Sequence, residues 1–148
     1  MSSLSIRPLE ERDHLAATGL LVHLNPDCST DVLIKRFRTI LADHPHYLPI
    51  GAFDGETMIG FGGAWIATKI WCGRYLEVDN IVVHPEHRSS GIGSALMEYF
   101  EKIAHERDCN IAVLDSYTSN YDSHRFYHRH GYQIWGFHFV KPLASIDR

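Results

Sequence analysis

The sequence lacks the features that mark several specialised classes of protein. No apolar run approaches the roughly 20 residues that a membrane-spanning helix needs, and the N-terminus lacks the charged and apolar regions of a secretory signal peptide. The three cysteines, Cys28, Cys72 and Cys109, are odd in number and far apart, and no Cys-x-x-Cys pair is present. This argues against both a disulfide framework and a zinc site. We therefore expect a soluble, cytoplasmic protein without a membrane partner.

The chain also lacks a basic excess, internal repeats and linker-like tracts. Its net charge is −4, so a nucleic-acid partner would meet no positive field, whereas a cationic amine would be mildly attracted. Hydrophobic residues at 45% and charged residues at 22% are ordinary for a globular protein. For 148 residues, a single domain spanning 1–148 is expected.

Apolar periodicity and turn residues predict alternating strands and helices. The expected strands are 4–8, 47–53, 57–68, 74–83 and 111–115, followed by closing strands within 132–140. The expected helices are 10–22, 31–42, 94–107 and one from Asp122 or Ser123 to His130, with Gly131 as a left-handed cap. The order βααβββαβαββ is that of an α/β protein, α+β by some schemes. Residues 111–115 form an apolar run typical of a strand buried on both faces, and the glycines at 60, 62 and 63 favour a bulge or tight packing over ligand contact.

A glycine-punctuated loop joins the strand ending near Val83 to the helix that follows. The stretch reads Val82-Val83-His84-Pro85-Glu86-His87-Arg88-Ser89-Ser90-Gly91-Ile92-Gly93-Ser94. N–H groups at a helix N-terminus are unpaired, and the helix dipole favours an anion such as a phosphate there. Gly91 and Gly93 let the backbone approach a ligand, and Arg88 adds a positive fork. A tight turn beside a solvated arginine is the alternative, because the P-loop lysine and the third glycine of a dinucleotide fingerprint are missing.

The segment Arg88 to Gly93 resembles the Arg/Gln-x-x-Gly-x-Gly/Ala signature of the GCN5-related N-acetyltransferase (GNAT) superfamily, and it follows a strand ending in Val-x-Pro, as it does there. The order of elements is similar over nearly the whole chain. This resemblance implies a GNAT fold: a mixed, mostly antiparallel twisted sheet of about seven strands, flanked by about four helices, with a splayed central strand pair.

The same resemblance implies acetyl-CoA as the cosubstrate. The residues that would contact it lie on the strand, the loop and a later segment: Ile81, Val82, Val83, Arg88, Ser89, Ser90, Gly91, Ile92, Gly93, Ser94, Asn120 and Tyr127. Pantetheine would pair with the exposed edge of the splayed strand. The N–H of Val83 would then polarise the thioester carbonyl.

Two carboxylates on the strand before the loop are candidates for a catalytic base. A primary alkylamine with a pKa of about 10.4 is nearly all protonated at neutral pH, so a proton must be removed. Glu77 and Asp79 share a strand face and point towards the cleft if Val78 and Val82 pack into the core. Both positions resemble base positions in members of the superfamily. They are otherwise exposed carboxylates, paired with Arg74, and a bulge could reverse which one faces the ligand.

Tyr127 stands where the superfamily has its general-acid tyrosine, which protonates the leaving thiolate. A phenol with a pKa of about 10 stays protonated near neutrality, and general acids contribute roughly 10²–10⁴-fold. Asn120 matches the position of a cofactor-contacting asparagine. Without the resemblance, Tyr127 would be read as an ordinary aromatic of the core or surface.

The C-terminal third is especially similar to the aminoalkylphosphonate N-acetyltransferases, in the run from Asp122 to Tyr127 and in the segment from His138 to Leu143. Those enzymes acetylate small amines that bear an anionic group, and they use a divalent cation. Asn120 departs from that subgroup. His124 and His128 lie one helical turn apart, but a lone pair lacks a third protein ligand, so we expect no metal site.

The sequence thus predicts transfer of an acetyl group from acetyl-CoA to the primary amine of a small molecule, by direct attack in a ternary complex. An aminoalkylphosphonate is the first candidate substrate. A polyamine is another if acidic residues line the acceptor pocket: Asp27, Asp31 and Asp43. Acetylation of a protein lysine or N-terminus and a non-catalytic acyl-CoA-binding module are the alternatives. Aromatic residues of the closing strands would suit a homodimer contact or the core: Trp135, Phe137 and Phe139.

Overall fold

The computed structural model describes residues 3–146 and 148. Its strands are β1 (Leu4–Pro8), β2 (Tyr47–Asp54), β3 (Thr57–Lys69), β4 (Gly73–Val83) and β5 (Ile111–Leu114). Its helices are α1 (His14–Leu24), α2 (Thr30–Asp43), α3 (Ile92–Glu106) and α4 (Tyr121–Arg129), with 3-10 turns at Glu11–Asp13 and Pro85–His87. Each strand and helix predicted before residue 131 is confirmed, with shifted ends. No helix in the described part of the chain is both long and apolar enough to cross a bilayer.

Local side chains explain several of these boundaries. Ser29 is the N-cap of α2, because its hydroxyl accepts a hydrogen bond from the Val32 N–H at 3.2 Å. Gly131 follows α4 with φ of 86°, which confirms the predicted left-handed cap. Asn120 caps α4 by accepting a hydrogen bond from the Ser123 N–H at 3.4 Å. The predicted cap, Asp122 or Ser123, was wrong because Asn, Asp and Ser cap helices about equally well.

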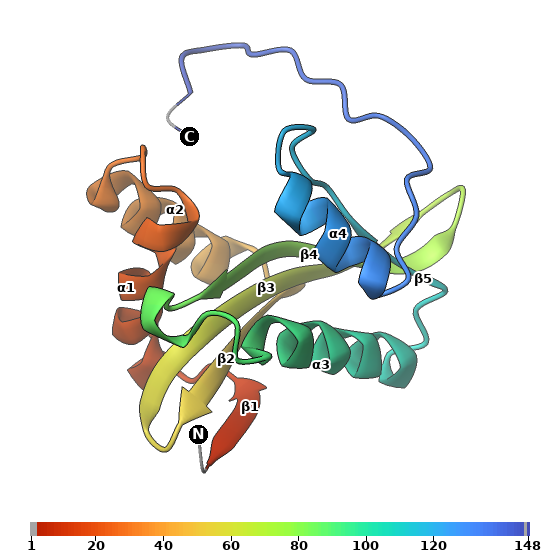
Figure 1. The fold of residues 1–148 in the computed structure, drawn as a ribbon. Helices are drawn as coiled ribbons and strands as arrows, with labels where there is room; N and C mark the ends of the chain where they lie inside the picture. The colour runs from red at the N-terminus through yellow and green to blue at the C-terminus, as the bar shows by residue number, and fades with distance from the viewer. Residues whose placement is uncertain (1–2, 147) are drawn as a thin grey trace.

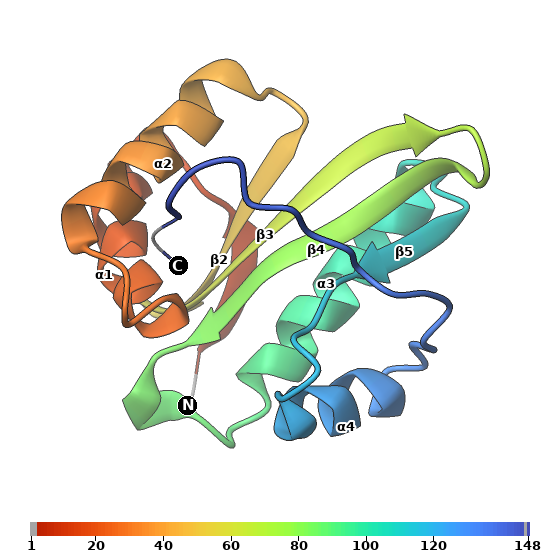
Figure 2. The same ribbon diagram turned by 90° about the horizontal axis from the view of Figure 1, so that it is seen from above.

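The strands form one sheet in the order β1-β2-β3-β4-β5, in which β4 and β5 are parallel and the other neighbours are antiparallel. α1 and α2 lie on one side of the strands and α3 lies on the other (Figures 1 and 2). Both β1 and β5 are edge strands. This is the mixed α/β arrangement that the sequence predicted.

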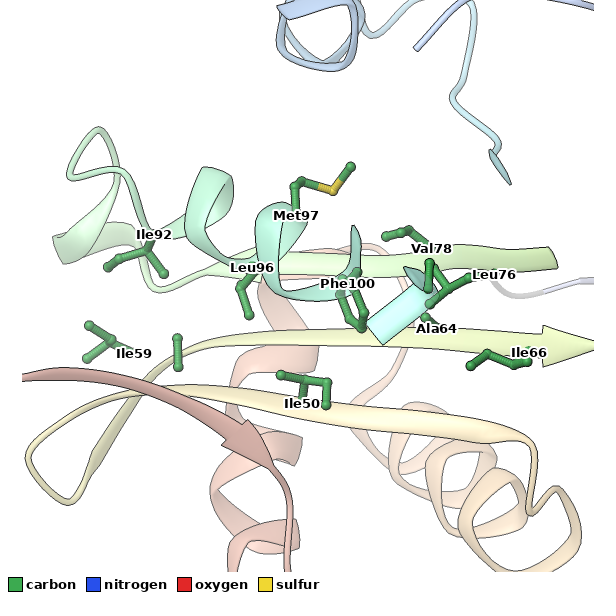
Figure 3. Packing of buried hydrophobic residues seen from close by; sticks show 12 residues of the cluster. Ile50, Ile59, Ala64, Ile66, Leu76, Val78, Ile92, Leu96, Met97 and Phe100 are labelled. Carbon is green, nitrogen blue, oxygen red and sulfur yellow. The ribbon is translucent and has the colours of Figure 1, made fainter. Parts of the chain in front are cut away.

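Two apolar clusters attach the helices to the sheet. On the α3 side, Leu96 and Phe100 pack against Ile50 and Leu76 (Figure 3). Gly62 lies under the Phe100 ring, where an added Cβ would come within 2.7 Å of a ring carbon. This confirms that the β3 glycines serve tight packing. On the other side, the cluster of α1 and α2 includes buried aromatic rings from α2, β2 and β3: Phe37, Tyr47 and Phe61.

Asp13 is buried at the start of α1 and is held by Arg7 of β1. The Arg7 guanidinium donates two hydrogen bonds to the carboxylate, at 2.7 and 3.1 Å, and the Glu10 N–H donates a third at 2.8 Å. The Arg7 hydrogen bond lowers the pKa of Asp13 to about 2, against the desolvation that raises it. This ion pair ties the first strand to the first helix.

We expect Asp13→Asn to lower the free energy of unfolding at neutral pH by about 1–3 kcal/mol, because Arg7 loses its charged acceptor. The folded pKa of about 2 lies below the ordinary value of 3.8. The carboxylate therefore stabilises the fold fully above about pH 4 and loses that contribution as the pH falls towards about 2. Urea unfolding across this range measures the effect. The prediction fails if the variant loses stability in acid as steeply as the parent protein.

The predicted number of seven strands was wrong for the described residues, which form a sheet of five. The closing strands expected within 132–140 are absent from it; this segment is irregular and mostly exposed. It leaves α4 and arches across to the side of α1 and α2 (Figures 1 and 2). The apolar alternation specifies a strand face, but a strand forms only where a neighbouring edge takes up its backbone N–H and C=O groups.

β5 is half-buried, so the expectation of a strand buried on both faces was also wrong. Its four residues pair with β4 on one side, and in the described residues no other strand pairs with its outer edge. Burial of an apolar run depends on which elements cover it, which the run itself does not specify.

Candidate active site

Two carboxylates of β4 lie on one face of the sheet, at the point where the strand carries a β-bulge. The register with β3 shifts after Gly63, so that Asp79 has no residue opposite it. Val78 is buried in the cluster with α3, whereas Val82, beyond the bulge, is buried in the cluster with α1 and α2. Glu77 and Asp79 both precede the reversal and share the face opposite α3. The predicted shared face is confirmed, although the two valines pack into different clusters.

The carboxylate of Asp79 is held in place by the indole ring of Trp65. The Trp65 Nε1–H donates a hydrogen bond to Oδ2 of Asp79 at 2.9 Å. Three aromatic rings surround the indole, with centroids 4.7, 5.1 and 5.5 Å away: Tyr47, His46 and His44. Asp79 therefore has a different partner from the Arg74 that the sequence suggested, and its carboxylate is fixed beside an aromatic cluster.

Glu77 lies in an acidic environment that favours its neutral form. Burial raises the pKa of Glu77 most. The carboxylates of Asp115 and Asp79 raise it further, while Lys69 and His138 oppose them. Glu77 is thus better suited than an ordinary surface carboxylate to accept a proton near neutral pH.

β4 and β5 diverge at the bulge. Beyond it, one edge of β4 has no partner strand among the described residues, and we call this the open edge. The pairing of the two strands ends at Val78 and Leu114, whereas β4 continues to Val83. On the other edge, the His84 N–H donates to the Ile59 carbonyl of β3 at 2.8 Å. Because antiparallel strands alternate the direction of their backbone groups, Val83 directs its N–H and C=O to the open edge.

By the same alternation, Ile81 also faces the open edge, whereas the backbone of Val82 faces β3. The splayed strand pair that the sequence predicted is present. Two of the three predicted strand residues direct backbone groups to this edge, where the Val83 carbonyl accepts a hydrogen bond from Arg88. The third contributes an apolar side chain to the core.

The loop after β4 leads these groups into the N-terminus of α3. Ser89 and Gly91 adopt positive φ angles of 66° and 81°, and Gly91 is the N-cap without a side-chain hydrogen bond to the helix. The first N–H groups of α3, from Ile92 to Ser94, are therefore available to an anion. The Arg88 Nε donates to the Val83 carbonyl at 3.4 Å, which places its guanidinium beside the open edge.

α4 lies against the start of α3 and carries Tyr127. A Cβ on Gly93 would lie 3.5 Å from the Phe126 ring, and His130 Nε2 lies 3.0 Å from Ser94 Oγ. Tyr127 packs against the same cluster as Ile81 and Val83. Burial raises the pKa of Tyr127, so its phenol stays protonated at neutral pH and can donate a proton.

The remaining predicted residues have structural partners. Asn120 is occupied as the cap of α4, and the Ser90 hydroxyl donates to the His87 carbonyl. His124 Nε2 lies 2.8 Å from the Tyr117 carbonyl, and His128 Nδ1 lies 3.0 Å from the Tyr132 carbonyl. Among the residues the structure describes, no three His, Cys, Asp or Glu side chains are grouped as a metal site.

Sequence reasoning missed two residues of this region. Trp65 lies directly opposite Glu77 across the β3–β4 hairpin, so counting back from the turn at 70–72 would have found it. His130 contacts Ser94 only because α4 packs on α3, and no local pattern predicts that contact.

Residues 9–132 match the acetyltransferase (GNAT) family. A thialysine N-epsilon-acetyltransferase of Sus scrofa is 34% identical over 68 residues, which are 44% of this chain and 40% of that protein. An aminoalkylphosphonate N-acetyltransferase of Salmonella typhimurium is 36% identical over 73 residues, 49% of this chain and 46% of that one. The chain thus spans less than half the length of these curated relatives.

The fold is also similar to solved structures. An aminoglycoside N-acetyltransferase in complex with CoA superposes with a TM-score of 0.82 at 20% identity, covering 96% of each chain. At this identity, the likeness concerns the fold alone.

Proposed function

This chain belongs to the acetyltransferase (GNAT) family, and on that premise we propose that it transfers an acetyl group from acetyl-CoA to the primary amine of a small molecule. The observation that carries the proposal is the open edge of β4 at Val83, which continues into the uncapped N-terminus of α3. An extended chain can pair with such an edge while a phosphate occupies such a helix end. The two features fit the two halves of one elongated, phosphate-bearing ligand.

Bound acetyl-CoA would supply the thioester that donates the acetyl group. In this proposal the N–H groups from Ile92 to Ser94 and the guanidinium of Arg88 hold the pyrophosphate, each charge-assisted hydrogen bond contributing roughly 1.5–3 kcal/mol. The backbone of Ile81 pairs along the edge, and the Val83 N–H polarises the thioester carbonyl of the donor. Ser89 and Ser90 shape the loop.

Glu77 is the proposed base and Tyr127 the proposed acid. Glu77 takes the proton of the ammonium group, so that the amine nitrogen can form its bond to the acetyl carbon. Tyr127 gives its proton to the sulfur as the carbon–sulfur bond breaks. The second proton that the nitrogen loses on becoming an amide returns to the Tyr127 phenolate through water, so charge and atoms balance. Asp79, fixed by Trp65, keeps a negative charge near the incoming amine. Direct attack in a ternary complex needs no further residue.

The substrate class is a small primary amine. An aminoalkylphosphonate is one candidate, supported by the partial similarity to the Salmonella enzyme. A lysine-like amine is another, because the acidic surroundings of Glu77 favour a cation and because the Sus scrofa relative is named for thialysine.

A panel assay tests the proposal. Thiol release from acetyl-CoA would be followed with aminoalkylphosphonates, thialysine, polyamines, amino sugars and lysine peptides, with and without a divalent metal. We expect release with one class of small amine. Release with peptides alone would identify a protein acetyltransferase instead, and coenzyme A binding without any release would identify a binding module.

Glu77→Gln should lower kcat/KM at neutral pH by about 10²-fold, because the amide cannot take the proton. In the parent protein, kcat/KM should fall as the pH drops below the raised pKa of Glu77. Asp79→Asn removes a charge that raises the pKa of Glu77. In this variant the fall in kcat/KM should therefore occur at lower pH, and most of the activity at neutral pH should remain. A pH–rate profile of the three proteins checks this. Loss of activity in Asp79→Asn but not in Glu77→Gln would assign the base to Asp79.

A further inference from the structure

A hydrogen bond between two side chains crosses the middle of the sheet. The Tyr47 hydroxyl of β2 donates to Oδ1 of Asn80 of β4 at 2.6 Å, and β3 lies between these two strands (Figure 2). Gly63 of β3 leaves room for this contact, because a Cβ there would lie 1.6 Å from the Tyr47 hydroxyl oxygen. The buried phenol therefore reaches Asn80 only because β3 has a glycine at this point.

The bond ends beside the β-bulge of β4. The extra residue of the bulge is Asp79, and the residue after it, Asn80, lies opposite Gly63. A bulge locally disrupts the ladder of backbone hydrogen bonds. A slip of one residue beyond it would turn every later side chain to the other face. Side-chain hydrogen bonds to the two residues of the bulge oppose such a slip.

Two aromatic donors from two different strands hold the two residues of the bulge. Trp65 of β3 donates to Asp79, and Tyr47 of β2 donates to Asn80. The two rings also pack on each other, with centroids 4.7 Å apart. Burial, and then the charge of Asp79, raise the pKa of Tyr47. The hydroxyl therefore keeps its proton and stays a donor throughout the neutral pH range.

The bulge joins two parts of the candidate site. The proposed base, Glu77, lies before it, and the open edge with the Val83 N–H lies beyond it. If the strand slipped by one residue at the bulge, the Val83 N–H would turn from the open edge towards β3. The position of the base relative to the group that polarises the thioester therefore depends on the register of β4.

We propose that Tyr47 is a positioning residue for acetyl transfer: through Asn80 it fixes the register of β4 at the bulge, and so aligns the base with the open edge. This inference rests on the proposed function. Tyr47 takes no part in proton transfer. Its loss should misalign the two parts of the site without removing either, and a misplacement of about 1 Å can lower a rate by about 10²-fold.

Tyr47→Phe removes the hydroxyl and keeps the ring. We expect kcat to fall by about 10-fold or more. The Kd for coenzyme A should change by less than about threefold, because the proposed phosphate site lies on α3 and not on β4. Asn80→Ala should give a similar loss of kcat. The double variant should lose no more than the larger single loss, because the two residues act as one unit.

Hydrogen exchange of the chain without ligands tests the register independently of activity. The backbone of Val82 faces β3, so its amide should exchange about 10-fold faster in Tyr47→Phe than in the parent. Tyr99→Phe is the matched control. Tyr99 is a half-buried phenol of α3 that packs against the cluster there, and its hydroxyl has no hydrogen-bond partner among the described residues. This variant should change neither the exchange nor kcat.

Unchanged exchange of Val82 in Tyr47→Phe overturns the proposal, whatever the activity. Faster exchange with the kcat of the parent overturns it too, because the register would then not limit catalysis. Thermal unfolding would show that each variant is folded at the assay temperature. A parent that acetylates no amine of the panel refutes the proposed function and the catalytic role of Tyr47 with it. Faster Val82 exchange would in that case still show that Tyr47 fixes the register of β4.

Discussion

Replacing Tyr127 with phenylalanine should lower kcat by about 10²–10³-fold while coenzyme A binding changes little. The variant removes only the hydroxyl that we propose as the general acid, and such groups contribute roughly 10²–10⁴-fold. The ring would keep its place, because it packs against the α3 cluster and its centroid lies 5.4 Å from the Phe126 ring. Steady-state kinetics with the best amine of the panel, beside calorimetric titration with coenzyme A, measures both quantities.

Tyr132→Phe is the control for this experiment. Its ring centroid lies 6.2 Å from that of Tyr127, and burial together with Glu101 and Tyr127 raises the pKa of Tyr132 to about 12. It is a second half-buried phenol in the same cluster, without a proposed role in proton transfer. We expect its removal to change kcat by less than about threefold. Equal losses in both variants would mean that packing, not proton donation, explains the effect of Tyr127.

Gly91→Val should weaken acetyl-CoA binding by about 100-fold or more. Gly91 has φ of 81°, a conformation that costs an L-residue roughly 1–2 kcal/mol and a β-branched one more. Relief of that strain would rotate the loop and withdraw N–H groups of α3 from the phosphate. Loss of two charge-assisted hydrogen bonds, at roughly 1.5–3 kcal/mol each, accounts for the expected weakening.

Gly55→Val separates this effect from a general loss of stability. Gly55 turns the β2–β3 hairpin with φ of 61°, and an added Cβ meets nothing within 4 Å at either glycine. The two substitutions should therefore lower the melting temperature similarly, but only Gly91→Val should raise the Kd for acetyl-CoA. If both variants bind the cosubstrate as the parent does, the loop is not the phosphate site.

The features that were predicted correctly are those encoded within a few residues of the chain. Gly131 adopts the predicted left-handed conformation directly after α4, and β2 and β3 form a hairpin from strands that are adjacent in sequence. The strand, loop and helix from β4 to α3 follow from β-branched residues, two glycines and a helical repeat. These contacts are short in sequence, so local propensity and steric limits decide them.

Long-range packing decided the geometry of the candidate site. The bulge at Asp79 arises from the pairing of β3 with β4, and it reverses the faces of the residues that follow, so that Val78 packs with α3 whereas Val82 packs with α1 and α2. The raised pKa of Glu77 depends on residues from four segments, including Asp115 beyond β5 and His138 in the irregular chain after α4. No window of sequence contains this information, because low dielectric and nearby charge are properties of the assembled fold.

Residues 132–140 show most clearly what each level determines. By itself the sequence determined the family resemblance, the order of elements through α4 and the glycine-punctuated loop between β4 and α3, and it predicted Tyr127 as the candidate acid. The tertiary structure alone decided that β4 carries a bulge at Asp79, that Asp79 accepts a hydrogen bond from Trp65, and that residues 132–140 form no strand in the sheet. The physical reason is that a side-chain pattern selects a face and a period, whereas pairing requires an edge of matching position to accept the backbone hydrogen bonds.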